Sequence, residues 1–324
     1  MVQRSFSDDN PPRHEFAIGE AFGGSRLDRA LAQLLPQHSR SRLKGWIEAH
    51  RVEVDQKVVS EPKFKLRGGE AVSVRELAPP RNASFSAQPI PLAIVHEDTA
   101  IIVVAKPAGL VMHPGSGNWN GTLLNALLHH APQLATLPRA GIVHRLDKDT
   151  TGVLVVAKTL AAQTDLVRQL QARSVRREYL AIAHGDVQRA TTVDAPIGRH
   201  PTQRTTMAVV ASGKPARTHL TVVERFGCAT LIRCRLETGR THQIRVHLTA
   251  IGHPLLGDPT YRGRKLASAT LPQVVRTFAR QALHAQRLSL VHPESRALCQ
   301  WEVAPPTDFE GLLSALRSVR PVLS

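Results

Sequence analysis

The segment with the densest reactive chemistry is residues 141–152, Gly-Ile-Val-His-Arg-Leu-Asp-Lys-Asp-Thr-Thr-Gly. Asp147 stands there between Arg145 and Lys148, and cations on both sides favour its ionised form. An ionised carboxylate can act as a nucleophile or as a general base. Aspartates in such loops more often form turns or structural ion pairs, so spacing alone favours a structural role.

Two other uses of these carboxylates remain open. Asp147 and Asp149 could hold Mg²⁺ together with substrate phosphates, although Arg145 and Lys148 make that site electrostatically poor. They could also serve as the two carboxyl groups of a glycosidase if the loop turned both inward. The chain contains no Cys-x-x-Cys pair and no His-x-x-x-His pair, so no metal centre is predicted.

Three further residues stand where a reaction could use them, and each has an ordinary structural alternative. Tyr179 lies in a strand-like run, where a tyrosine most often packs half-buried. Arg245 lies in a second strand-like run, residues 243–247, and is by itself more typical of a surface cation; Arg240 is a competing cation. Lys106 ends an apolar strand, where it would make a structural or a phosphate contact.

The elements that must position these residues are short strands and helices punctuated by Gly and Pro. Hydrophobic patterning predicts five strands and two helices, at residues 101–105, 153–157, 179–184, 218–223 and 229–236 and at residues 123–130 and 160–173. Strands and helices do not alternate regularly, which argues against a doubly wound parallel sheet. The pattern therefore predicts a mixed α+β fold.

A smaller unit precedes this region. Residues 27–35 have helical spacing, a second short helix starts near residue 39, and β-like pieces follow. Arg40, Arg42 and Lys44 stand at the start of the second helix, whose amides also favour phosphate; the alternative is an ordinary solvated face. We expect four parts: a flexible N-terminal arm (1–20), a small basic α/β domain that is a candidate nucleic-acid reader (21–76), a linker (77–91) and the domain that carries Asp147 (92–324).

The charge of the chain indicates a polyanionic partner. Its 324 residues carry 42 Lys+Arg and 26 Asp+Glu, a formal net charge of +16, which is typical of proteins that bind nucleic acid or an anionic membrane surface. Residues 81–324 hold 29 Lys+Arg and 15 Asp+Glu, so +14 of the charge lies there.

No apolar stretch approaches the ~20 residues of a membrane-spanning helix. Three cysteines are too few for a disulfide framework, and the first ten residues lack the apolar core of a signal peptide, so we expect a cytoplasmic protein.

Several blocks of the sequence resemble, in order, the motifs of one enzyme family. Residues 144–152, His-Arg-Leu-Asp-Lys-Asp-Thr-Thr-Gly, resemble the signature of the RluA-type RNA pseudouridine synthases, in which the aspartate is the essential catalytic residue. Further family blocks are matched at residues 106–114, 177–179, 236–247 and 252–261. Residues 26–55 resemble the S4 RNA-binding domain. The resemblance is closest to the subtype that modifies large-subunit (23S) ribosomal RNA.

The resemblance implies a mixed, mainly antiparallel catalytic sheet and an isomerisation of uridine to pseudouridine that needs no cofactor. Asp147 would attack C1′ or C6 or act through a glycal, Arg245 would be its ion-pair partner, and Tyr179 would stack on the flipped base. The implied partner is ribosomal RNA or the pre-ribosomal large subunit, at the stem-loop that bridges the two subunits. Independently of the resemblance, we expect no membrane partner and take a monomer as the default state. The residues expected to contact RNA are Arg40, Arg42, Lys44, Lys106, His144, Arg145, Lys148 and Arg240. The alternatives are the same chemistry at other ribosomal or transfer RNA sites, and a non-catalytic RNA-binding factor of ribosome assembly.

Overall fold

The structure is a computed structural model that describes residues 12–38, 40–76, 85–114, 120–203, 205–262 and 273–318. The chain divides into two compact units, Met1–Arg81 and Asn82–Ser324. Within the described ranges, no helix is long and apolar enough to cross a membrane. All residues of the loop around Asp147 belong to the second unit.

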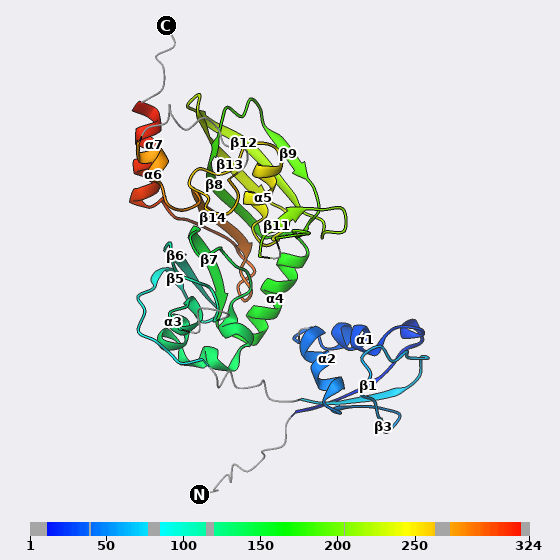
Figure 1. The fold of residues 1–324 in the computed structure, drawn as a ribbon. Coiled ribbons are helices and arrows are strands. Elements are labelled where there is room, and N and C mark those ends of the chain that lie inside the picture. The colour runs from blue at the N-terminus through cyan, green and yellow to red at the C-terminus, as the bar shows by residue number, and fades with distance from the viewer. Residues whose placement is uncertain are drawn as a thin grey trace, which may run out of the picture. The chain divides into compact units, whose positions relative to one another are not determined.

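The first unit is a four-stranded antiparallel sheet, in the order β1-β4-β2-β3, with two helices packed on it (Figure 1). Helices α1 and α2 bury Leu27, Leu31, Leu43 and Ile47 in its core. The elements of this unit are β1 (Arg13–Ala17), η1 (Glu20–Phe22), α1 (Leu27–Leu34), α2 (Arg40–Glu48), β2 (Val52–Val54), β3 (Lys57–Val58) and β4 (Ala71–Arg75).

Two of the expected domain boundaries are wrong. Residues 13–17 of the expected arm form β1, which pairs with β4 along its whole length, and Phe16 packs against the core of the first unit. Residues 85–91 of the expected linker belong to the second unit, where Ile90 packs on the core and the Gln88 N–H donates to a backbone carbonyl of α3. The other parts of these two segments, residues 1–11 and 77–84, lie outside the described residues.

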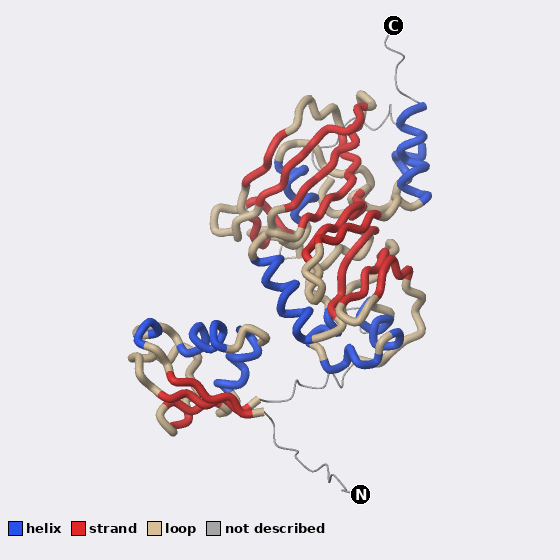
Figure 2. Tube along the Cα trace, turned by 180° about the vertical axis from the view of Figure 1, so that it is seen from behind, coloured by secondary structure: helices blue, strands red, loops and turns tan. Residues whose placement is uncertain are grey.

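A nine-stranded sheet runs through the second unit, in the order β5-β6-β7-β14-β8-β13-β12-β9, with β15 paired to β14 (Figures 1 and 2). All its pairs are antiparallel except β7 with β14. The predicted mixed, mainly antiparallel α+β fold is therefore confirmed. The strands are β5 (Ala93–Glu97), β6 (Ile101–Lys106), β7 (Thr151–Ala157), β8 (Arg176–His184), β9 (Thr191–Asp194), β10 (Ile197–Arg199), β11 (Met207–Val209), β12 (Arg217–Arg225), β13 (Ala229–Leu236), β14 (Leu283–Val291) and β15 (Leu298–Glu302), of which β10 and β11 form a separate ribbon.

Helices cover both faces of this sheet. On β6 and β7, α3 packs against one face and α4 against the other, because Ile102 and Ile101 point to opposite sides. On β8 and β13, α5 lies on the face that carries Tyr179 and α7 on the opposite face. The helices are α3 (Leu123–His130), η2 (Pro132–Thr136), η3 (Pro138–Gly141), α4 (Leu160–Gln171), α5 (Gln243–Ala250), α6 (Gln273–Thr277) and α7 (Thr307–Ser318).

Gly152 makes the parallel junction of β7 with β14 possible. Its backbone has a φ of +115°, and a Cβ at this position would lie 2.1 Å from the carbonyl oxygen of Ala285. Only glycine allows the two strands to approach so closely in this conformation. The junction begins one residue earlier, where Thr151 pairs with His284, so it fixes the end of the loop that carries Asp147.

Candidate active site

The loop between η3 and β7 is tied down on both sides of Asp147. Before Asp147, Nε2 of His144 accepts a backbone N–H of β7 at 3.1 Å, and burial lowers the pKa of His144 to about 3, so the ring stays neutral. After Asp147, the side chains of Lys106 and Arg280 donate to the carbonyl oxygens of the next two residues at 2.7 and 3.1 Å. This anchoring holds Asp147 in one position, as a reacting group requires.

Helix α5 brings Arg245 to Asp147, with Nη1 donating to Oδ2 at 3.1 Å. The expectation that residues 243–247 are strand-like is wrong. These residues begin a helix instead, and the Gln243 side chain closes the turn that leads into it by accepting the backbone N–H of Arg240 at 3.0 Å. Residues three apart share one face of a helix. His242, at the N-terminal cap, therefore faces Asp147 together with Arg245.

A second carboxylate holds Arg245 from the other side. Nε and Nη2 of Arg245 donate to the two oxygens of Asp258 at 2.7 and 2.8 Å, and the Asp258 side chain is completely buried. Burial alone would lower the pKa of Arg245, but the ion pairs with Asp258 and Asp147 outweigh it and raise that pKa. The guanidinium is therefore a permanent, rigidly held cation beside Asp147.

A chain of hydrogen bonds fixes the tautomer of His242. The backbone N–H of Met207 donates to the Tyr261 hydroxyl oxygen at 2.9 Å. Nδ1 of His242, 2.8 Å away, is the acceptor that the described residues offer to the Tyr261 O–H, so we assign this O–H as the donor to Nδ1. The ring proton of neutral His242 therefore lies on Nε2, which is 3.8 Å from Oδ1 of Asp147. Burial lowers the pKa of His242 and favours this neutral form. His242 also has a left-handed backbone (φ 57°), which is uncommon and typical of functional positions.

Strand β8 presents Arg177 and Tyr179 to the same space, because side chains two apart lie on one face of a strand. Both are buried, with 7% and 6% exposure. Burial raises the pKa of Tyr179 and lowers that of Arg177. Gly239 makes room for Arg177, since a Cβ there would lie 2.7 Å from Nη1. A neutral phenol and a further guanidinium are thus available to a substrate at Asp147.

These side chains line one open cleft of about 910 Å³ in the second unit. Two acidic residues, Asp147 and Glu237, line the cleft against six arginines, namely Arg139, Arg145, Arg173, Arg177, Arg240 and Arg245. Because Asp147 is paired with Arg245, the remaining lining is strongly cationic. Such a lining favours an anionic substrate.

The expectation that Lys106 contacts RNA is wrong. Lys106 is only 2% exposed, and its Nζ donates to the carbonyl oxygens of Pro107, Leu110 and Lys148 at 2.7, 2.9 and 2.7 Å. An ammonium has three N–H groups, so none remains for a phosphate. Burial lowers the pKa of Lys106 to about 8, which leaves it charged at neutral pH. Lys106 is a structural clamp on the loop of Asp147.

We expect Lys106→Met to destabilise the second unit by about 3 kcal/mol, because it leaves three carbonyl groups without their donor. Urea unfolding measures this loss. Lys214→Met, a matched change of an exposed lysine in the same unit, is the control and is expected to change the free energy of unfolding by less than about 0.5 kcal/mol. Equal stability of the two variants would contradict the proposed role of Lys106 as a structural clamp.

The other residues of the second unit expected to contact RNA differ in position. Arg145 and Arg240 line the cleft. His144 also lines it, but its Nε2 is already used by a backbone N–H. Lys148 is exposed and is not among the residues that line the cleft.

The residues expected to contact RNA in the first unit lie on α2. Arg40 donates to the buried Asp28 at 2.8 Å and is exposed. Arg42 lies over the Trp46 ring, 5.3 Å from its centroid. Lys44 pairs with an acid one turn further on at 3.4 Å and is also exposed. Arg40 and Lys44 thus present accessible positive charge on this helix.

Four residues of the site were not predicted from the sequence. Asp258 and Tyr261 lie in the block of residues 252–261 that matched a family motif, so a signal for them existed. His242 lies between Arg240 and Arg245, where a helical period would have placed it beside Arg245. Arg177 is two residues before Tyr179, and the strand period places both on one face.

Comparisons with known proteins identify the family of this chain. Residues 100–250 match a family model described as RNA pseudouridylate synthase, and residues 25–72 match the S4 domain. A ribosomal large subunit pseudouridine synthase D from Nitrosomonas europaea is 56% identical and covers 97% of this chain and 90% of its own. The Escherichia coli (strain K12) protein of that name is 54% identical over 91% of each chain.

Two solved human structures, RNA pseudouridylate synthase domain containing 1 and 4, have TM-scores of 0.53 and 0.56 with this chain, at 28% identity. They cover 72% and 69% of it, and 97% and 93% of their own chains. These matches show an enzyme of the isomerase class, and the cationic cleft with its arginine-held aspartate is its candidate active site. The chain belongs to the RNA pseudouridylate synthase family and carries an S4 domain at its N-terminus.

Proposed function

We propose that this enzyme converts uridine to pseudouridine in large-subunit (23S) ribosomal RNA, at the stem-loop that bridges the two ribosomal subunits. The main support for ribosomal RNA as the substrate is the high identity, 52–56%, to eight relatives that all bear the name ribosomal large subunit pseudouridine synthase D. The cationic cleft and the exposed basic residues of α2 support a polyanionic substrate of this kind. The cytoplasm is the compartment in which such a substrate is found.

The proposed chemistry centres on Asp147. The N1–C1′ bond of uridine breaks, the base rotates, a C5–C1′ bond forms, and the proton lost from C5 is balanced by one gained at N1. Oδ2 of Asp147 is occupied by Arg245, so Oδ1 is the oxygen that attacks C1′ or C6 or removes a proton. No redox change occurs, and the side chains of the cleft supply every step.

A uridine in a stem-loop must leave its stack to reach Asp147, at a cost of a few kcal/mol. Phosphate contacts from Arg145 and Arg240 at the cleft would offset that cost, and Tyr179 would stack on the flipped base. The first unit would bind a neighbouring part of the RNA through Arg40 and Lys44.

The direct test is to incubate unmodified 23S ribosomal RNA, and pre-ribosomal large subunits, with the purified enzyme and to map pseudouridine chemically. Pseudouridine confined to the bridging stem-loop is the expected result. Modification of other ribosomal or transfer RNA sites would overturn the assigned target and leave the chemistry intact. RNA binding without any pseudouridine would instead indicate an assembly factor.

We expect Tyr261→Phe to lower the rate constant of a single turnover by about tenfold, with little change in RNA affinity. The change removes the hydroxyl that fixes the His242 tautomer, so part of the population carries its ring proton on Nδ1, away from Asp147. Rapid-quench single-turnover kinetics separates this rate from binding. The burial that lowers the pKa of His242 persists in the variant, so no new pH dependence is expected from this ring. An unchanged single-turnover rate would contradict a positioning role for His242.

A further inference from the structure

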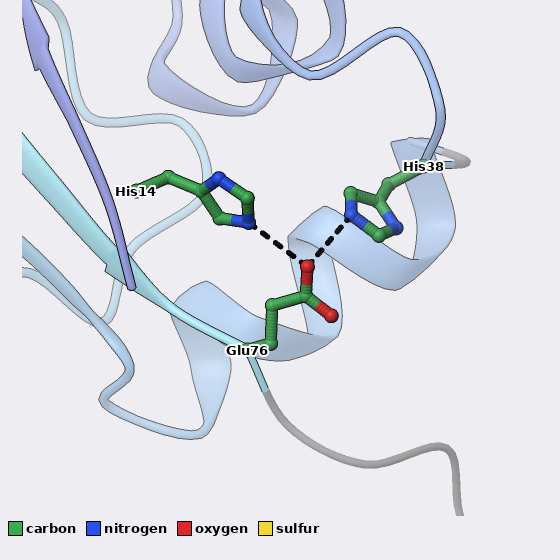
Figure 3. Close-up of side chains that lie close together, drawn as sticks. All are labelled: His14, His38 and Glu76. Carbon is green, nitrogen blue, oxygen red and sulfur yellow. Dashed lines mark hydrogen bonds and ion pairs between the residues drawn. The ribbon is translucent and has the colours of Figure 1, made fainter. Parts of the chain in front are cut away.

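A cluster of two histidines and one glutamate lies in the first unit and takes no part in the proposed reaction (Figure 3). His14 comes from β1, His38 follows α1, and Glu76 follows β4 directly. The fold brings them together: β1 pairs with β4, and the Glu76 N–H donates to the carbonyl of Pro12 at 2.9 Å. Three separate parts of the chain therefore meet at this point.

The ligand atoms of this cluster converge. Nε2 of His14 and Nε2 of His38 lie 2.9 and 3.1 Å from the same carboxylate oxygen, Oε1 of Glu76. All three atoms lie within 4.8 Å of one another. Tetrahedral ligands bound to a metal at about 2.0–2.1 Å are about 3.3 Å apart. The two distances from nitrogen to the carboxylate oxygen are already close to this spacing, and the two imidazole nitrogens, which lie within 4.8 Å of each other, would close to it as the ion binds.

We propose that His14, His38 and Glu76 form a binding site for a borderline divalent transition metal, with Zn²⁺ as the reference ion and water as the remaining ligand. Two imidazole nitrogens and one carboxylate oxygen suit Zn²⁺, whereas Mg²⁺ and Ca²⁺ prefer all-oxygen sites. The His14 and Glu76 side chains are 27% and 20% exposed, so an ion and a water ligand can enter, while His38 at 6% forms the inner wall. The site is separate from Asp147 and independent of the proposed function.

The surroundings set a moderate affinity. Nδ1 of His38 is buried without a hydrogen-bond partner in the described residues, so a metal-bound His38 lacks the supporting contact that strengthens such ligands. Its ring packs edge-on against Trp46, 4.8 Å between centroids, which fixes the ring direction. Arg42 acts electrostatically on both His38 and Glu76 and opposes a cation. We expect a dissociation constant in the micromolar range.

A bound ion would join β1, the segment after α1 and the end of β4, and so would stabilise the first unit. In the ion-free protein, hydrogen bonds from the two imidazoles to Glu76 make the same connection less strongly. The expected consequence is a higher unfolding temperature of the first unit in the presence of Zn²⁺, without a requirement for the ion in the isomerisation.

The test uses the tag-free, full-length chain after EDTA treatment, titrated calorimetrically with ZnCl₂ and in parallel with Co²⁺ followed by visible absorption. One ion per chain is expected, and Glu76→Gln should weaken its binding at least tenfold while preserving fold and shape. If Glu76→Gln does not fold, His14→Gln, a change at the more exposed ligand, is used in its place and should weaken Zn²⁺ binding in the same way. The matched control is His96→Gln, which alters another His–carboxylate cluster, that of His96 and His292 around Asp98, and should leave binding unchanged.

Absence of Zn²⁺ binding by the wild type below about 100 µM would overturn the proposal. Equal affinity in Glu76→Gln and the wild type would also overturn it, as would loss of the ion in His96→Gln alone, which would place it at Asp98. Uridine isomerisation by the same preparations is recorded separately, so failure of the metal site and failure of the proposed function are distinguishable.

Discussion

Asp147→Asn is expected to abolish uridine isomerisation, lowering the single-turnover rate by at least about 10⁴-fold, while the protein stays folded and binds RNA. Asparagine keeps the size of the side chain, and its carbonyl oxygen can still accept the Arg245 Nη1–H group that now reaches Oδ2 at 3.1 Å. What it lacks is the negative charge of a nucleophile or base. The loss should therefore fall on the chemical step alone.

Asp149→Asn is the matched control for this prediction. It makes the same chemical change two residues further along the same loop, on a side chain that is not among those lining the cleft. Asp149 supports the loop through its backbone carbonyl, which accepts from Arg280 at 3.1 Å, and the substitution leaves that carbonyl in place. We expect a much smaller loss for Asp149→Asn, because its carboxylate acts on the reaction only by favouring the charged form of Lys106, which clamps the loop. Pseudouridine formation by Asp147→Asn at a rate similar to the control would show that another group does the chemistry.

The sequence predicted the parts of this site that depend on local pattern. The apolar run at residues 153–157 is rich in valine and buried on both faces, and the mostly apolar run at residues 229–236 is buried over most of its length, so both form strands. The capping pair of Thr122 and Asn125 marks the start of α3, which begins where the pattern predicted it. Asp147 could be singled out because its polar loop leads directly into one of these strands.

The other features of the site depend on contacts between segments that are distant in the sequence, and no local pattern encodes such contacts. Residues 243–247 contain β-branched residues and look strand-like, yet the Gln243 side chain and packing under β12 and β13 make them helical. The sequence could not show that Lys106 is saturated by three carbonyl groups, two from its own turn and one from residue 148. The cluster of His14, His38 and Glu76 likewise arises only when β1 and β4 pair.

Arg245→Met is expected to have the second large effect, on both stability and activity. Arg245 is 5% exposed and lies between two carboxylates, one of which, Asp258, is completely buried. Removing the cation leaves the Asp258 charge buried without a counter-charge, held only by the backbone N–H groups of Thr260 and Tyr261, which costs about 3–5 kcal/mol. Urea unfolding should show this loss. Arg287→Met removes a partly exposed arginine that also lies between two carboxylates, Glu178 and Glu302, and should cost less than about 1 kcal/mol.

The double variant Arg245→Met/Asp258→Asn separates the two roles of Arg245. Removing both charges relieves the uncompensated carboxylate, so most of the lost stability should return. Activity should not return, because Asp147 still lacks the guanidinium that fixes its Oδ2 and turns Oδ1 toward the substrate. We expect the single-turnover rate of the stable double variant to stay about 10²–10³-fold below wild type. A stable double variant with normal turnover would mean that Arg245 serves the fold alone and that the Asp147 loop, clamped by Lys106 and Arg280, positions the carboxylate without it.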